Sequence, residues 1–220
     1  MPLELIQIDT QDKPDCAVIW LHGLGANGHD FEPIVPELNL PDSLRARFIF
    51  PHAPVQTVSL NDGVEMPSWY DIYGLDMNSQ EDSAGIEKIT AEIHALIQQQ
   101  IDNGIAAEKI VLAGFSQGGA LTLHAGFTFP QTLAGLMCLS CYLPLREQIA
   151  TTLKNTPRDL PIFMAHGSFD DVLPIAYAQL AMQIIQEQGL KVQWHEYTCA
   201  HTVCAEEIQD IRDYLLACWK

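Results

Sequence analysis

The 220-residue sequence has few basic side chains, few cysteines and no long apolar run. It contains 11 Lys and Arg against 28 Asp and Glu, which gives a formal net charge of −17. Nucleic acids and anionic bilayers are bound through basic side chains, so this balance disfavours both as partners. No apolar run reaches the roughly 18 residues of a membrane span, and the stretch from Met1 to Leu5 lacks the basic start and apolar core of a secretory signal. We therefore predict a cytoplasmic protein without a membrane span.

The cysteines are too few for a disulfide scaffold, and without a secretory signal we expect them to be reduced thiols. Cys138 and Cys141 form a C-x-x-C pattern, but they lie in an apolar segment and no second pair completes a zinc site. Packing in the core is the better interpretation of this pair.

The chain contains no repeat, no low-complexity tract and no Pro/Gly/Ser-rich linker, so we predict a single domain over residues 1–220. Short apolar runs are separated by segments with helical periodicity. Continuous apolar runs of this kind are typical of strands covered on both faces. The runs lie at residues 16–21, 48–50, 110–113, 136–139, 162–165 and 192–197.

Helices are predicted between these runs. Apolar residues recur every three or four positions from Asp82 until Gly104. A second helix is expected over 175–188, behind Pro174, and a third at the C-terminus from about Ile208. The alternation predicts an α/β fold, with a mostly parallel central sheet and helices on both faces. Ligand sites in such folds lie beyond the carboxyl ends of the strands.

A G-x-S-x-G pattern, Gly114 to Gly118, follows the apolar run 110–113 and precedes a probable helix. This is the nucleophile elbow of α/β-hydrolases, a sharp strand-to-helix turn that presents the serine hydroxyl to a cleft. Glycines on either side let strand and helix approach closely. The pattern predicts Ser116 as a nucleophile, the alternative being a tight turn with an idle serine.

A serine nucleophile needs a histidine base, and in this fold the chain order is Ser, acid, His. His124 lies two turns into the helix that follows Ser116, His166 precedes any suitable acid, and His195 lies within a strand. His201 follows the last strand, at the edge of the sheet where Ser116 emerges. We predict that His201 is the base.

Two aspartates, Asp170 and Asp171, follow the strand at 162–165 and compete for the role of acid. Their spacing does not separate them: one would orient His201 and the other would cap the next helix. The backbone amides of Leu24 and Gln117 are the candidate oxyanion donors, since glycines in the loop after residue 21 allow the backbone to approach a substrate.

Cys199, His201 and Cys204 are close in sequence and raise the alternative of metal binding. No fourth ligand stands at a usual spacing, and neither a Cys₂His₂ nor a Cys₄ pattern is completed. We expect no metal and no cofactor.

Five segments follow one another along the chain: LHGLG at 21–25, MPSWYD at 66–71, GFSQGG at 114–119, HG-x-x-D at 166–170 and Y-x-x-x-H at 197–201. Together they resemble the phospholipase/carboxylesterase family of α/β-hydrolases, which includes acyl-protein thioesterases and small bacterial carboxylesterases. The resemblance implies Asp170 rather than Asp171 as the acid, and supports His201 and the amides of Leu24 and Gln117. It also implies cofactor-free hydrolysis of fatty acyl esters and thioesters, and a homodimer. Ala200, before His201, departs from the glycine usual in the family, as does Cys141.

Substrate selection is predicted to come from the irregular stretch 54–79. Only about twenty residues separate Leu139 from Pro161, too few for a large lid domain. Long irregular loops are often functional, so this stretch is expected to form an apolar wall for an acyl chain, the alternative being a packed surface loop. We predict hydrolysis of short- to medium-chain acyl esters or thioesters, with lysophospholipids or acylated proteins as the long-chain alternative. The wall residues are Met66, Trp69, Tyr70 and Leu75.

Overall fold

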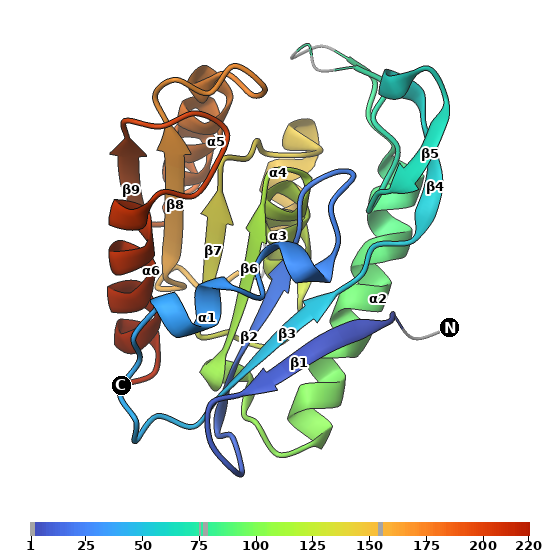
Figure 1. Ribbon diagram of the computed structural model, residues 1–220. Coiled ribbons are helices and arrows are strands. Elements are labelled where there is room, and N and C mark those ends of the chain that lie inside the picture. Colours follow the sequence, from blue (N-terminus) through green and yellow to red (C-terminus); the bar gives the residue numbers. More distant parts are fainter. Residues whose placement is uncertain (1–2, 75, 77–78, 154–155) are drawn as a thin grey trace.

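The computed structural model describes residues 3–74, 76, 79–153 and 156–220. Its centre is a seven-stranded sheet in the order β1-β3-β2-β6-β7-β8-β9, in which β1 is antiparallel to β3 and all other neighbours are parallel (Figure 1). This confirms the predicted fold class, a mostly parallel sheet. The strands are β1 (Leu5–Asp9), β2 (Cys16–Leu21), β3 (Ala46–Pro51), β6 (Ile110–Phe115), β7 (Gly135–Leu139), β8 (Ile162–Gly167) and β9 (Val192–Tyr197).

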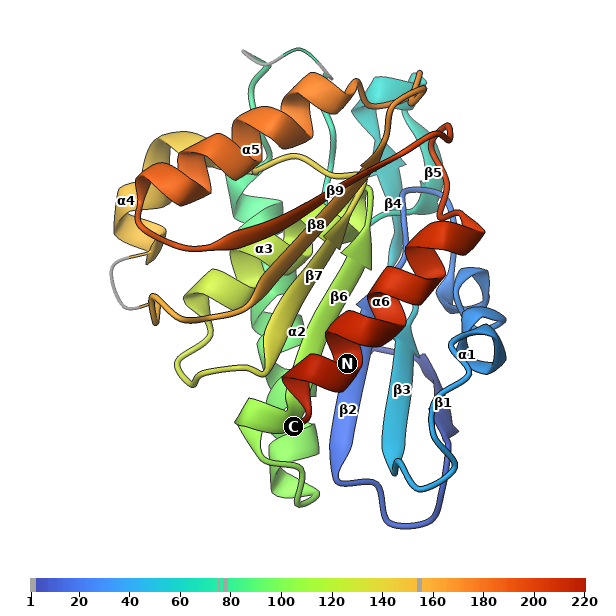
Figure 2. The same cartoon turned by 90° about the vertical axis from the view of Figure 1, so that its left-hand side faces the viewer.

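Helices cover both faces of the sheet (Figure 2). One face carries α2 (Ser83–Asp102), α3 (Gln117–Thr128), α4 (Ile149–Thr152) and α5 (Ile175–Glu187), and the other carries α1 (Ile34–Glu37) and α6 (Ala205–Cys218). Short 3₁₀ helices complete the set: η1 (Gly28–Asp30), η2 (Ser59–Asn61), η3 (Ala107–Lys109) and η4 (Arg146–Gln148).

Strand β2 shows why these segments fold as buried strands. Ile19 and Leu21 point into the core beneath α2, α3 and α5, while Val18 and Trp20 point into the core beneath α1 and α6. All of them are at most 1% exposed. Burial of apolar surface stabilises by about 25 cal/mol per Å², so a strand that is apolar at every position is stable only between two layers of helices.

The predicted strands agree with β2 and β9 to the residue, and the others are longer by one to three residues at their ends. The antiparallel edge strand β1 was not predicted, because its side chains alternate only between half-buried and exposed. Inside the supposedly irregular stretch 54–79, β4 (Val55–Val58) and β5 (Val64–Pro67) form a two-stranded hairpin. Its residues are exposed or half-buried except for Val58, with Val55 at 66% and Val64 at 57%, so no buried run marks it in the sequence.

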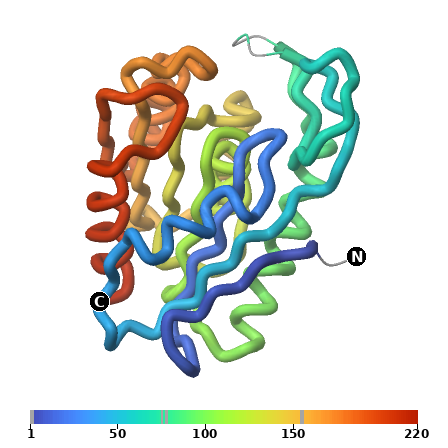
Figure 3. The backbone as a smooth tube through the Cα atoms, in the orientation of Figure 1, coloured from blue at the N-terminus to red at the C-terminus, as the bar shows by residue number. Residues whose placement is uncertain are grey.

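The loops that follow β2, β6, β8 and β9 meet at one end of the sheet, the end toward which the parallel strands run (Figure 3). The motifs at Gly23, Ser116, Asp170 and His201 lie on these four loops. None of the helices in the described ranges combines the length and hydropathy that crossing a bilayer requires.

Candidate active site

Ser116 sits on the turn between β6 and α3 with φ +55° and ψ −119°. A non-glycine residue at positive φ is strained, and such strain concentrates at functional sites. The turn is possible because its flanking glycines have no side chains: a methyl group on Gly114 would collide with the carbonyl of Gly118, and one on Gly118 with the carbonyl of Leu21. The G-x-S-x-G pattern thus corresponds to a tight crossing of β6, α3 and β2.

His201 touches both of its expected partners. Its Nε2 lies 2.9 Å from Ser116 Oγ, and its Nδ1 lies 2.6 Å from Asp170 Oδ2. Because an ionised carboxylate only accepts hydrogen bonds, Nδ1 carries the proton and Nε2 is left to accept from the serine hydroxyl. The imidazole also packs on Phe115, with ring centroids 4.7 Å apart. Three side chains distant in sequence therefore form one hydrogen-bonded chain.

The carboxylate of Asp170 is fully buried, and both of its oxygens accept hydrogen bonds. Oδ1 accepts hydrogen bonds from the backbone amides of Val172, at 3.0 Å, and Leu173, at 2.7 Å. Asp171 is exposed. The two contacts that the sequence divided between the aspartates, one to His201 and one to the amides before the next helix, are therefore both made by Asp170.

His166 is a second histidine against Asp170, and the sequence did not reveal this contact. Its ring is fully buried, and its Nε2 lies 2.8 Å from the carbonyl oxygen of Leu173 and 3.1 Å from Asp170 Oδ2. Burial lowers the pKa of His166 below its usual value, against the opposing influence of these hydrogen-bond partners. The neutral ring therefore donates through Nε2.

The loop after β2 lies directly beside the serine. A methyl group on Gly23 would stand 3.5 Å from Ser116 Cβ, and the Gly25 amide is tied to the carbonyl of Pro67 at 2.8 Å. The amide of Gln117 is the first of α3, where no preceding helical carbonyl is available to accept from it. The roles of Leu24 and Gln117 as oxyanion donors remain predictions.

The side chain of Gln117 joins the serine turn to the segment after β5. Its Oε1 accepts from the Trp69 amide at 3.0 Å, and its Nε2 donates to the Tyr70 carbonyl at 2.7 Å. The Trp69 indole in turn donates to the carbonyl of His22 at 2.8 Å. His22 is buried, which lowers its pKa, and its Nε2 accepts from the Ala53 amide. Buried side chains thus hold the three segments around Ser116 together, which the spacing of these residues does not reveal.

A cavity with a mixed apolar and charged lining lies next to the Asp170 loop, although none of Ser116, Asp170 and His201 lines it. It is lined by Tyr70 and Tyr142, whose hydroxyls are 2.7 Å apart, and by Leu173, whose amide bonds Asp170. Tyr177 and Ile184 of α5 also line it. The residues of α5 were not among the predicted wall residues.

The residues predicted to form the acyl-chain wall lie in different places in the structure. Tyr70 lines the cavity, whereas Trp69 is 1% exposed and is not among the lining residues. Met66 lies elsewhere, with its sulfur 3.7 Å from where a side chain on Gly25 would begin. Leu75 lies outside the described residues.

The remaining candidate histidines lie apart from this chain of hydrogen bonds. His124 is buried in α3, with Nε2 3.5 Å from a carboxylate oxygen of Glu87. His195 of β9 stacks on Phe163 and lies 3.1 Å from Asp210 Oδ2.

Comparison with known proteins places these features in a family. A model of the phospholipase/carboxylesterase family matches residues 5–219. The acyl-protein thioesterase 1 of Mycosarcoma maydis is 39% identical over 218 residues, covering 92% of this chain and 91% of the relative. The acyl-protein thioesterase 1 of Yarrowia lipolytica is 38% identical over 219 residues, covering 97% and 96%. Among solved structures, SOBER1 of Arabidopsis thaliana has a TM-score of 0.87 and 30% identity, covering 93% of this chain and 99% of that chain.

Proposed function

The chain belongs to the phospholipase/carboxylesterase family, and on that premise we propose that it hydrolyses acyl esters and thioesters with Ser116 as nucleophile, His201 as base and Asp170 as orienting acid. The observation that carries the proposal is the pair of contacts made by His201, 2.9 Å to Ser116 Oγ and 2.6 Å to Asp170 Oδ2. A serine hydroxyl is a weak nucleophile until a neighbouring base removes its proton.

In the first half-reaction, His201 Nε2 takes the hydroxyl proton as Ser116 Oγ attacks the acyl carbon. Asp170 keeps the imidazole in the required tautomer and stabilises the imidazolium that forms. The proton then passes from His201 to the departing alcohol or thiol, which leaves an acyl group on Ser116.

In the second half-reaction, His201 deprotonates a water molecule that attacks the acyl-enzyme, and then returns the proton to Ser116 Oγ as the carboxylic acid leaves. Both tetrahedral intermediates carry a negative oxygen. We assign its stabilisation to the amides of Leu24 and Gln117, the latter at the N-terminus of α3 where the helix dipole favours negative charge.

The acyl chain is assigned to the cavity between Tyr70 and α5. Its aromatic and aliphatic side chains suit a hydrocarbon chain, and Leu173, whose amide bonds Asp170, joins it to the reacting groups. Charged side chains also line it: Asp71, Asp76, Glu81, Asp82 and Arg146. Lining residues run along α5 from Tyr177 to Ile184, a helical distance of about 10 Å that suits a chain of medium length. We therefore favour short- to medium-chain esters and thioesters over long-chain lipids.

A fluorophosphonate probe tests the nucleophile. The probe is expected to label the wild-type protein once, on Ser116, and Ser116→Ala should lose both labelling and ester turnover. Ser168→Ala is the matched control, since Ser168 lies on the loop of Asp170 but bonds the carbonyl of Tyr197 instead. Labelling of folded Ser116→Ala, or full turnover by it, would overturn the proposal.

A series of nitrophenyl esters, acyl-coenzyme A thioesters and acylated peptides tests the substrate class. We expect kcat/KM to peak at a medium chain length and to fall for the longest chains. Partitioning of the acyl group toward an added alcohol, in preference to water, would indicate an acyltransferase instead.

We also propose a domain organisation and a cellular location for the enzyme. We place one catalytic domain, residues 1–220, in the cytoplasm, acting on small acyl compounds or acylated proteins. The homodimer implied by the family resemblance stays a prediction, and gel filtration with light scattering checks it.

A further inference from the structure

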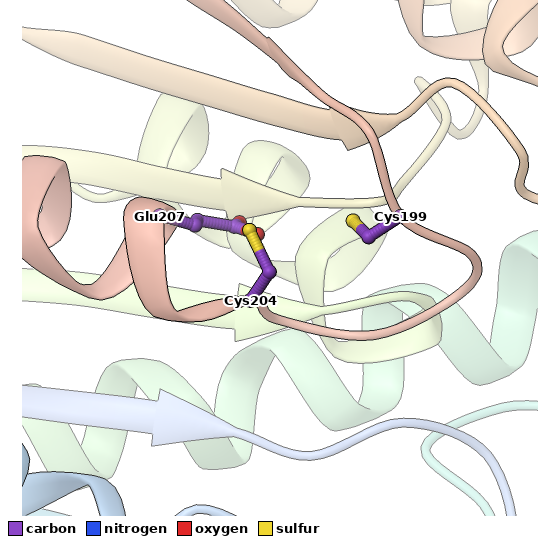
Figure 4. A group of neighbouring side chains, drawn as sticks. All are labelled: Cys199, Cys204 and Glu207. Carbon is purple, nitrogen blue, oxygen red and sulfur yellow. The ribbon is translucent and has the colours of Figure 1, made fainter.

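Two thiols and a carboxylate converge beside the loop that carries His201. Cys199 follows β9, Cys204 precedes the first turn of α6, and Glu207 lies within that turn. Their Sγ, Sγ and carboxylate oxygen atoms all lie within 4.8 Å of one another. Figure 4 shows the three side chains directed toward a common point between the end of β9 and the start of α6.

Glu207 places a buried carboxylate oxygen at this point. Its side chain is buried, with the residue 1% exposed. The carboxyl accepts a hydrogen bond from the backbone amide of Cys204, and its Oε1 has no further partner among the described residues. Burying a polar atom without a hydrogen-bond partner lowers the stability of the fold, and in native proteins such atoms are usually bonded to water or to an ion. The two thiols are only half-buried, which leaves an entry route from solvent.

We propose that Cys199, Cys204 and Glu207 bind a Zn²⁺ ion. Tetrahedral zinc holds thiolates at about 2.3 Å and carboxylate oxygens at about 2.1 Å, which separates its ligand atoms by about 3.5 to 3.8 Å. The three atoms already lie within 4.8 Å of one another, so small side-chain rotations close the site. Binding releases to solvent the protons of the two thiols and that of the Glu207 carboxyl, whose pKa burial raises to about 8, and a water molecule takes the fourth position.

The donor set favours zinc over a hard cation. Thiolates are soft ligands that select zinc or copper(I), whereas calcium and magnesium require oxygen donors. Sequence spacing suggested His201 as the third member of this group. In the structure His201 is held by Ser116 and Asp170, and the third donor is Glu207.

The position of the site links metal binding to the loop that carries the base. Cys199 and Cys204 bracket His201, so a bound ion joins the two ends of this segment and restricts its motion. We expect Zn²⁺ to raise the thermal unfolding midpoint of the reduced protein, because a ligand that binds only the folded state stabilises it.

Cobalt(II) substitution tests the site without reference to catalysis. The full-length protein, reduced and freed of metal by chelation, is titrated with Co²⁺ under anaerobic conditions. We expect one equivalent to bind with a thiolate-to-cobalt charge-transfer band and the intense visible bands of a tetrahedral site, both abolished by one equivalent of Zn²⁺. Ser116→Ala should bind Co²⁺ as the wild type does, which separates this result from the proposed hydrolysis.

Single substitutions test which side chains bind the metal ion. Cys199→Ser and Cys204→Ser should each lose most of the charge-transfer band, while Glu207→Gln should weaken Co²⁺ binding by about 10-fold or more. Cys218→Ser is the matched control, a half-buried thiol at the far end of α6, and should bind as the wild type does. Near-ultraviolet circular dichroism checks that each variant is folded.

Several results would overturn the assignment. These are absence of the charge-transfer band in the wild type, its persistence in folded Cys199→Ser, or unchanged affinity in folded Glu207→Gln. Alkylation by iodoacetamide gives a further check. Zn²⁺ should protect Cys199 and Cys204, and equal alkylation with and without Zn²⁺, or a Cys199–Cys204 disulfide that forms equally fast in its presence, would contradict metal ligation.

Discussion

His166 Nε2 lies 3.1 Å from Asp170 Oδ2, the same oxygen that accepts the hydrogen bond of His201. The His166 ring is fully buried and donates to the carbonyl of Leu173. It therefore contacts both ends of the turn from Asp170 to Leu173. It does not reach the serine. We infer that His166 is a positioning residue, which acts on the reaction through the orientation of the Asp170 carboxylate.

Replacement of His166 by Ala should lower kcat by about 10- to 100-fold, because a small displacement of a positioned group is enough for such a loss. His166→Gln, whose amide reaches the Leu173 carbonyl, should recover part of the rate. The lower limb of the pH–rate profile should also shift in His166→Ala, since Asp170 is less firmly held against His201. Unchanged kcat and profile in a folded His166→Ala would leave His166 with a packing role only.

The two adjacent aspartates should differ sharply in their effect on rate. Asp170→Asn is expected to reduce kcat by about 10³- to 10⁴-fold, because an amide that donates to His201 favours the wrong tautomer. Asp171→Asn is the matched control and should retain nearly full rate, since its side chain is exposed. Steady-state ester hydrolysis measures both, and comparable losses in the two variants would contradict the assignment of Asp170.

The preferred acyl chain length should depend on the side chains of α5 that line the cavity. Ile184→Trp adds bulk to the wall of the cavity and should lower kcat/KM for octanoyl esters by about 10-fold or more while sparing acetyl esters. Gln183→Trp is the control, because Gln183 lies on the exposed side of the same helix. A uniform loss across all chain lengths, or no loss, would place the acyl chain elsewhere.

The buried His124 should make folding sensitive to mild acid. Burial lowers the pKa of His124 below 6.5, although the nearby Glu87 opposes this shift. The unfolded chain therefore takes up a proton as the pH falls through about 6.5, whereas the folded protein does so only at lower pH. The contribution of His124 to stability is present above pH 6.5 and is lost as the pH falls.

Urea unfolding of the wild type and His124→Gln at several pH values measures this effect. The free energy of unfolding of the wild type should fall, relative to that of the variant, between pH 7 and pH 5. Their difference should be constant above about pH 7.5, where neither state binds the proton. A constant difference over the whole range would show that His124 titrates alike in both states.

Much of the fold was predictable because burial is a local pattern. Each strand between two helical layers is apolar at successive positions, so 16–21 and 192–197 agree with β2 and β9. The elbow was predictable for a related reason: the glycines around Ser116 are required by steric contact at the turn itself. The edge strand β1 and the hairpin β4–β5 are half-exposed, and no such pattern identifies them.

The sequence by itself determined the layered sheet, the serine turn and the order in which nucleophile, acid and base follow one another, because each depends on a few neighbouring residues. Tertiary structure alone decided which side chains meet. It placed the Asp170 carboxylate against both His201 and His166, brought α5 to the cavity lined by Tyr70, and set Glu207 rather than His201 beside two thiols. Such contacts join residues on separate loops, and their geometry depends on how helices and strands pack, which no local spacing encodes.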